Sequence, residues 1–294
     1  MRLVQRGSAP RAQATPDATA RRLGRAAVAA LYDELALASK PGLVSFEDSG
    51  SHSDMDARTF MRSLFALRHS YPRFAALGAQ GADFAALAHE GQAAEARMLA
   101  ATGGINTHRG AVFTLGLLCA SAGALQAAGR PLQPDALRRT LVARWGHALA
   151  ARGGVSPPAT AASNGAHAAQ ALGLRGANAE AAAGMPVLFD AALPALRAAL
   201  AADLPAPAAR LQAFFTTLAV LDDTNLVHRG GLAGLRWAQA QARAWLAAGG
   251  AHGPDAALRA HHMHRTFVQR RLSPGGAADV LAAACWLQRV CVRP

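Results

Sequence analysis

Apolar side chains recur along this chain at the three- and four-residue spacing of amphipathic helices. In the first such segment, one inward stripe is formed by Leu23, Val28, Leu31 and Leu35. No stretch alternates apolar and polar residues with the period of two that marks a strand. The pattern predicts an all-α protein, a single globular bundle of roughly ten helices without a sheet. Helices are expected over residues 18–39, 56–77, 79–101, 111–129, 134–151, 163–172, 188–202, 206–221, 252–271 and 277–292, with further helical runs around Glu180 and Trp237.

Proline and glycine interrupt this pattern where loops are expected. Pro41 and Gly42 end the first helix, and a long polar loop follows over residues 40–56. Pro72 should disturb the end of the second helix. A mobile connection is expected over residues 153–162, which contain a pair of prolines.

The two ends of the chain differ in composition. Residues 1–17 are rich in Arg, Ala and Pro and lack the apolar core of a signal peptide, so we expect a disordered tail. Residues 18–294 should form one all-helical domain. The uncharged stretch 111–129 approaches the length of a membrane span, but its polar residues and internal glycines favour a buried core helix. No membrane association is expected.

Composition adds three points. Apolar residues make up 52% of the chain and aromatic residues only 5%, and alanine dominates the apolar share, so the helices should pack closely. The net charge of +12 favours an anionic partner. Nucleic acid would satisfy it, but the arginines are scattered and no basic and aromatic ladder is present, and a polyphosphate would use the same field. Cys119, Cys285 and Cys291 lack metal-type spacing, which favours free thiols in a reducing compartment such as the cytoplasm.

Three pairs of adjacent glycines each precede an expected helix: Gly103-Gly104, Gly230-Gly231 and Gly275-Gly276. Free N–H groups at a helix start, together with the helix dipole, bind anions, although an ordinary cap is the alternative for each pair. His-Arg pairs beside the first two favour phosphate binding, and Ser273 is expected to cap the last helix. The only lysine among 30 basic residues, Lys40, offers a compact charge for the same purpose. The candidate phosphate-binding residues are Lys40, Gly103, Gly104, Asn106, Thr107, Arg109, Asn225, His228, Arg229, Gly230, Gly231, Ser273, Gly275 and Gly276.

Acidic residues are scarce, with only 18 in the chain, so their clustering carries information. Paired carboxylates are what Mg²⁺ needs beside a phosphorylated ligand, and we expect Asp54, Asp222 and Asp223 to bind it. Local ion pairs with arginine are the alternative. Glu47 and Asp48 are interpreted as exposed loop charges. His261, His262 and His264 are interpreted as solvated helix residues because no acidic or cysteine partner lies at ligand spacing.

Four motifs together resemble the triphosphoribosyl-dephospho-coenzyme A synthase family. They are KPGLVS with GSHSDMD, TGGINTHRGAVFTLGLL, DDTNLVHRGG and SPGGAADVLA, in the family's order, from Lys40 to Leu281. The form GSHSDMD and Ser45 are more similar to the malonate decarboxylase branch than to the citrate lyase branch. One departure concerns Arg175, because the acidic residue that relatives place close behind it stands here at Glu180.

The resemblance implies a cytoplasmic pentosyltransferase. The family transfers the 5-triphosphoribosyl group of ATP to the 2'-hydroxyl of 3'-dephospho-coenzyme A, with inversion, and releases adenine. A phosphoribosyl-dephospho-coenzyme A transferase would then load the product onto the acyl carrier subunit of malonate decarboxylase, and citrate lyase would use the same product. A homodimer is the expected assembly, although the sequence does not fix the oligomeric state.

The expected residue roles follow from that reaction. Lys40, Arg109 and Arg229 would grip the triphosphate with Mg²⁺ on the aspartates. An oxocarbenium-like transition state needs a base for the hydroxyl and a proton donor for adenine. Asp54 is the expected base, with His52 or His108 assisting the leaving group. Two other functions are a magnesium-dependent hydrolase of ADP-ribose linkages and a non-catalytic binder of nucleic acid or polyphosphate.

Overall fold

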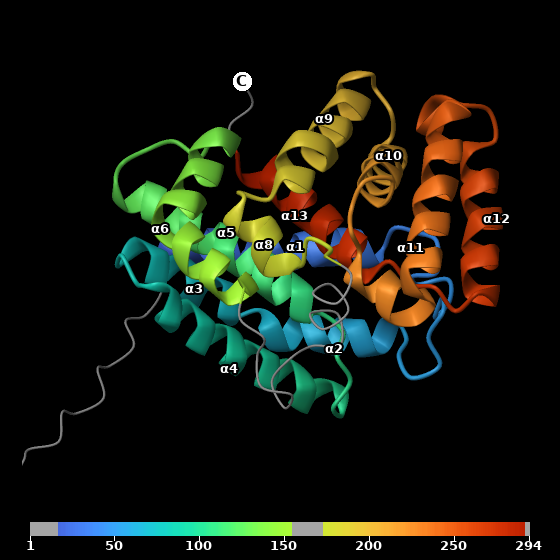
Figure 1. The fold of residues 1–294 in the computed structure, drawn as a ribbon. Helices are drawn as coiled ribbons and strands as arrows, with labels where there is room; N and C mark the ends of the chain where they lie inside the picture. The colour runs from blue at the N-terminus through green and yellow to red at the C-terminus, as the bar shows by residue number, and fades with distance from the viewer. Residues whose placement is uncertain (1–16, 155–172, 292–294) are drawn as a thin grey trace, which may run out of the picture.

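The computed structural model describes residues 17–154 and 173–291, and every regular element in these ranges is a helix (Figure 1). The all-α prediction is therefore confirmed. The expected tail and the short helix 163–172 lie outside the described residues, apart from Asp17, which caps the first helix. The elements are α1 (Ala18–Leu35), α2 (Ala57–Leu67), α3 (Ser70–Ala79), α4 (Phe84–Thr102), α5 (Arg109–Ala127), α6 (Pro134–Gly154), α8 (Ala177–Ala182), the π-helix η1 (Val187–Ala192), α9 (Leu193–Ala201), α10 (Ala206–Leu218), α11 (Thr224–Ala247), the 3₁₀ helix η2 (Gly250–His252), α12 (Ala256–Gln269) and α13 (Gly275–Val290).

The closest packing in the core is between α3 and α5. A Cβ atom built on Gly78 of α3 would lie 1.9 Å from the carbonyl oxygen of Ala120 in α5. The same holds in reverse, because a Cβ on Gly123 of α5 would lie 1.9 Å from the carbonyl oxygen of Ala75 in α3. The two backbones touch only because glycine leaves the space free. This contact confirms the expectation of closely packed helices.

The uncharged helix α5 is central to the core. It is the one helix in the described ranges that is long and apolar enough to cross a membrane, and 72% of its most apolar window is buried inside the protein. Its neighbours α3 and α13 cover it, and α13 also packs on α1, where the indole of Trp286 donates to the carbonyl oxygen of Leu23 at 3.1 Å. The three cysteines are buried and unbridged, as expected.

Two segments that were each expected to form one helix are divided into two elements in the structure. The segment 56–77 forms two helices, because the chain turns at Arg68 and His69 between α2 and α3. Pro72 lies in the first turn of α3, where its missing N–H costs nothing, rather than near the end of a helix. The segment 188–202 starts as a π-helix, η1, and continues as α9. Figure 1 shows α11 and α12 side by side at one end of the molecule.

A helical segment follows each of the three glycine pairs, as predicted, but the pairs have different local roles. Gly103 ends α4 with φ 70°, and Gly104 continues the turn with φ 91°. Gly231 has a non-helical backbone with φ 63°, so it divides α11 into a short first segment from Thr224 and a longer second segment that contains Trp237. Gly275 is the first residue of α13.

Candidate active site

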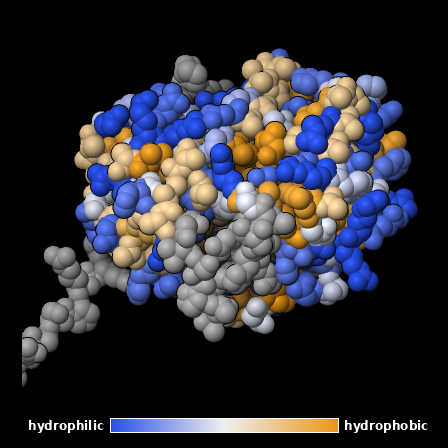
Figure 2. All heavy atoms as spheres, in the orientation of Figure 1, coloured by the Kyte–Doolittle hydropathy of each residue, from blue (hydrophilic) through white to orange (hydrophobic). Residues whose placement is uncertain are grey.

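A cavity of about 550 Å³ lies where the starts of α5, α11 and α13 meet α8 and the loop before α2. Most of the predicted site residues line it, although they come from segments far apart in the sequence. They are His52, Asn106, Thr107, His108, Arg109, Asp222, Asp223, Asn225, His228, Arg229, Ser273, Gly275 and Gly276. Lys40, Asp54, Gly103, Gly104, Gly230 and Gly231 are outside its lining. Figure 2 shows apolar side chains gathered in the middle of one face of the molecule, with hydrophilic side chains around them.

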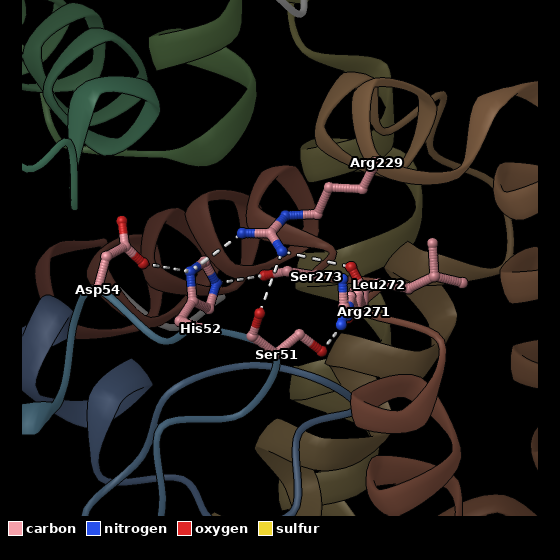
Figure 3. A network of polar contacts seen from close by, with 7 residues as sticks. All are labelled: Ser51, His52, Asp54, Arg229, Arg271, Leu272 and Ser273. Carbon is pink, nitrogen blue, oxygen red and sulfur yellow. Dashed lines mark hydrogen bonds and ion pairs between the residues drawn. The ribbon is translucent and has the colours of Figure 1, made fainter.

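His52 is the centre of a polar network that joins the loop before α2 to the loop before α13 (Figure 3). Its Nε2 lies 2.9 Å from the hydroxyl oxygen of Ser273, and its Nδ1 lies 3.1 Å from the guanidinium of Arg229. Arg229 also donates to the carbonyl oxygens of Ser51 and Arg271, at 3.1 and 3.3 Å. Burial, and then the Arg229 cation, lower the pKa of His52, so the ring is neutral at pH 7.

Asp54 lies behind this network rather than in the cavity. Its carboxylate is 3.7 Å from Nδ1 of His52 and its side chain is 60% exposed. A general base must reach the proton that it removes, so this position does not suit the expected role of Asp54.

His108 lines the cavity from the residue before α5. Its Nδ1 lies 2.6 Å from the hydroxyl oxygen of Ser63, which also accepts from the hydroxyl of Thr107 at 2.7 Å. Its Nε2 is buried and has no hydrogen-bond partner among the described residues. The edge of the ring meets Phe60, with 4.9 Å between the ring centroids. Burial lowers the pKa of His108 to about 3, so the ring is neutral.

Three arginines bring positive charge to the cavity lining: Arg109, Arg175 and Arg229. Arg109 pairs with Glu95, and its backbone N–H donates to the Asn106 side chain at 3.1 Å. Asn106 therefore accepts from the first residue of α5, although the N-cap position itself is occupied by His108. Arg175 lies 3.4 Å from Glu180.

The departure from the family pattern at Arg175 therefore does not remove its segment from the site. Glu180 also lines the cavity. Its carboxylate accepts the N–H of Val187 at 2.8 Å, which ties α8 to η1.

Asp223 holds two helix starts together. One of its oxygens accepts the N–H groups of Asn225 and Leu226 at the start of α11, and the other accepts the N–H of Ala277 in α13 at 2.9 Å. A Cβ on Gly276 would lie 3.1 Å from its carboxyl carbon, so a side chain there would have to displace the carboxyl group slightly. Ser273, the expected cap of α13, contacts His52 instead, and the N-cap residue of α13, Pro274, makes no side-chain hydrogen bond to the helix.

These contacts change the predicted metal site. Both oxygens of Asp223 are occupied by N–H groups, Asp54 is outside the cavity, and the described residues contain no group of three His, Cys, Asp or Glu side chains that could hold a metal ion. The structure therefore does not bring the three expected aspartates together as one ligand set. Asp222 is the member that keeps a partly exposed carboxylate in the cavity, where it accepts the N–H of Arg175 at 3.4 Å.

Lys40 is buried and does not contact the cavity. Its ammonium lies 3.0 Å from the carboxylate of Glu34, and its side chain is 0% exposed. Glu34 itself lines the cavity. Lys40 therefore neutralises a cavity carboxylate from behind, and the expectation that it grips a phosphate directly was wrong for this structure.

His264 is likewise buried rather than solvated. It contacts the carbonyl oxygen of Lys40 through Nδ1 at 2.9 Å and Asp48 through Nε2 at 3.1 Å. A second hollow, of about 470 Å³, lies beside His264 and contains none of the candidate phosphate-binding residues.

Sequence reasoning missed several cavity residues, of which Glu34 and Asp279 are charged types and Phe60 and Phe113 are apolar. The sequence does contain a signal for Asp279. This residue lies one helical turn after Gly275 in the motif SPGGAADVLA, so the two residues share a helix face. Glu34 had none, since the hydrophobic pattern around it is that of an ordinary helix.

An all-α protein whose helix starts, arginines and neutral histidines surround one partly apolar cavity belongs to the class of enzymes that bind a phosphorylated ligand. Residues 20–293 match the model of the ATP:dephospho-CoA triphosphoribosyl transferase family, and the chain belongs to this family. A protein of Azotobacter vinelandii, named "Probable 2-(5''-triphosphoribosyl)-3'-dephosphocoenzyme-A synthase", is 38% identical over 279 residues, which cover 92% of each chain. No solved structure matches. The resemblance found in the sequence motifs is confirmed.

Proposed function

We propose that this protein transfers the 5-triphosphoribosyl group of ATP to the 2'-hydroxyl of 3'-dephospho-coenzyme A and releases adenine. The observation that carries the proposal is the meeting of three separate family motifs, around His52, Arg109 and Arg229, in one cavity. The triphosphate is a handle in this reaction, because the bond that breaks joins ribose to adenine.

The triphosphate would bind at the arginines and the open helix start. Arg109, Arg175 and Arg229 supply charge, and the first N–H groups of α13 at Gly275 and Gly276 have no side-chain cap. Mg²⁺ would arrive on the triphosphate, and Asp222 is the carboxylate that suits it, since Mg²⁺ is commonly held by one or two carboxylates plus phosphate oxygens. The ion would neutralise phosphate charge and orient the chain of phosphates.

His108 would accept the proton of the attacking hydroxyl. Its Nε2 is buried at the cavity without a partner, and its ring is neutral and able to receive a proton. A weak base is sufficient, because the hydroxyl becomes strongly acidic only as its oxygen bonds to the oxocarbenium-like carbon. Ser63 would hold the ring through Nδ1.

The malonate decarboxylase branch is the finer proposal, and it rests on the form GSHSDMD and on Ser45. In this pathway the product would pass, in the cytoplasm, to a transferase that loads the acyl carrier subunit. Because citrate lyase would need the same product, an assay of this enzyme alone does not separate the branches, whereas the neighbouring genes do.

The test is release of adenine from ATP and Mg²⁺, followed by chromatography, with and without 3'-dephospho-coenzyme A. The proposal expects release only with the acceptor, together with an adduct of the mass of triphosphoribosyl-dephospho-coenzyme A. Release without the acceptor would indicate a hydrolase instead. Absence of release in both reactions, with salt-dependent binding of polyanions, would indicate a binding protein.

A further inference from the structure

Asp279 brings a carboxyl group to the cavity from the second turn of α13, against the start of α5. A Cβ atom on Gly110 would lie 2.0 Å from Oδ2 of Asp279. The glycine that follows the first His-Arg pair is therefore required by the position of this carboxyl group. The absence of a Cβ at Gly110 leaves room for the side chain of Asp279 at the start of α5.

The other acidic residues of the cavity lining have clear partners. Glu34 pairs with Lys40, and Glu180 pairs with Arg175. Asp223 accepts three N–H groups, and Asp222 accepts the N–H of Arg175 at 3.4 Å. Asp279 has no ion pair with any described residue, and the N–H of Ala111 is the one group that donates toward it. No cation among the described residues therefore neutralises an ionised Asp279 through an ion pair.

The surroundings of Asp279 favour its protonated form. Burial, and then the nearby carboxyl groups of Glu34 and Asp223, raise the pKa of Asp279 well above its ordinary value. The group therefore favours its carboxylic acid form, which has an O–H to donate. It is therefore poorly suited to bind a cation and well suited to deliver a proton.

We propose that Asp279 is the catalytic acid that protonates adenine as it leaves, an inference that rests on the proposed function. As the bond between C1' of ribose and N9 breaks, its electron pair goes to adenine, and Asp279 supplies the proton to a ring nitrogen. The 2'-hydroxyl oxygen forms the new bond to C1' and gives its proton to His108. That proton restores Asp279 through solvent before the next turnover, so the net transfer is one proton from hydroxyl to adenine.

The test compares two donors in the variant Asp279→Asn, which keeps the shape of the protonated group. With ATP, we expect kcat to fall roughly 100- to 10,000-fold, the usual contribution of a general acid. With N7-methylated ATP, the base already carries a positive charge and needs no proton, so the variant should lose less than about tenfold. ATP binding and the melting temperature at pH 7 should not fall.

Asp222→Asn is the matched control, because it changes another cavity carboxylate and should reduce turnover of both donors by the same factor. Equal losses with both donors in Asp279→Asn, or near-full turnover with ATP, would overturn the proposal. If Asp279→Asn did not fold, Asp279→Ser would carry the same comparison. Failure of the proposed function would appear separately, as absence of acceptor-dependent adenine release by the unaltered protein.

Discussion

Arg229 fixes the tautomer of His52. A guanidinium can only donate hydrogen bonds, so Nδ1 of His52, 3.1 Å away, must be the accepting nitrogen. The ring proton is then on Nε2 and is donated to the hydroxyl oxygen of Ser273. The hydroxyl proton of Ser273 is left free for a ligand in the cavity.

The charge of Arg229 should be visible in the titration of His52. Because this cation lowers the pKa of His52, Arg229→Gln should raise that pKa while the amide still donates to Nδ1. Nuclear magnetic resonance of the His52 ring across pH measures the shift. A pKa that stays where it is in the unaltered protein would contradict this account of the network.

Substitution of Asp54 should affect turnover less than substitution of Ser273. Asp54→Asn should keep near-full turnover, because its side chain is 60% exposed and outside the cavity. Ser273→Ala should lower kcat/KM about tenfold, the effect of one lost hydrogen bond to a ligand. Steady-state adenine release measures both. A large loss in Asp54→Asn would restore Asp54 as the base.

Lys40 should matter for stability more than for binding. Lys40→Met leaves the buried carboxylate of Glu34 without its cation, and the free energy of unfolding should fall by roughly 3–5 kcal/mol. Urea unfolding at pH 7 measures the loss. The double variant Glu34→Gln with Lys40→Met is the control and should recover much of it, since no unpaired charge then stays buried. Without such recovery, the loss would not come from the ion pair.

Glycine should be required where α3 crosses α5 and dispensable at position 91 in α4. Gly78→Ala places a methyl group 1.9 Å from a backbone oxygen and should destabilise the protein by at least about 2 kcal/mol. Gly91→Ala is the control within α4, where the nearest atom is 4.0 Å away, and it should stabilise by about 1 kcal/mol through helix propensity. Thermal melting measures the change in stability of both variants. Equal changes in melting temperature would contradict the close contact between α3 and α5.

Asp279 should make the protein less stable as pH rises. Its pKa is raised in the folded state, so the folded protein binds more protons than the unfolded chain above about pH 4. Its contribution to stability is complete at lower pH and declines toward the folded pKa. Asp279→Asn removes this decline, so its melting temperature should exceed that of the unaltered protein at pH 7 by more than at pH 4.5. A constant difference would argue against the raised pKa.

The hydrophobic pattern was sufficient for the class of fold, because a helix shows its buried stripe in its own sequence. Helix boundaries were predicted less well, as at Pro72, since a proline suits the first turn of one helix as readily as it ends another. The motifs located most of the cavity lining. They could not show that the carboxylate of Asp223 accepts hydrogen bonds from two helix starts, or that Lys40 pairs with Glu34. These two contacts depend on which segments of the chain meet in the folded protein.

The carboxylate of Asp223 sets a fixed span between α11 and α13. Because each helix start is held to it by hydrogen bonds of 2.9 Å, neither can move away without breaking one. The starts of α11 and α13 therefore form one rigid corner of the cavity lining, and a ligand that enters there meets two helix starts at a separation that the protein has already fixed.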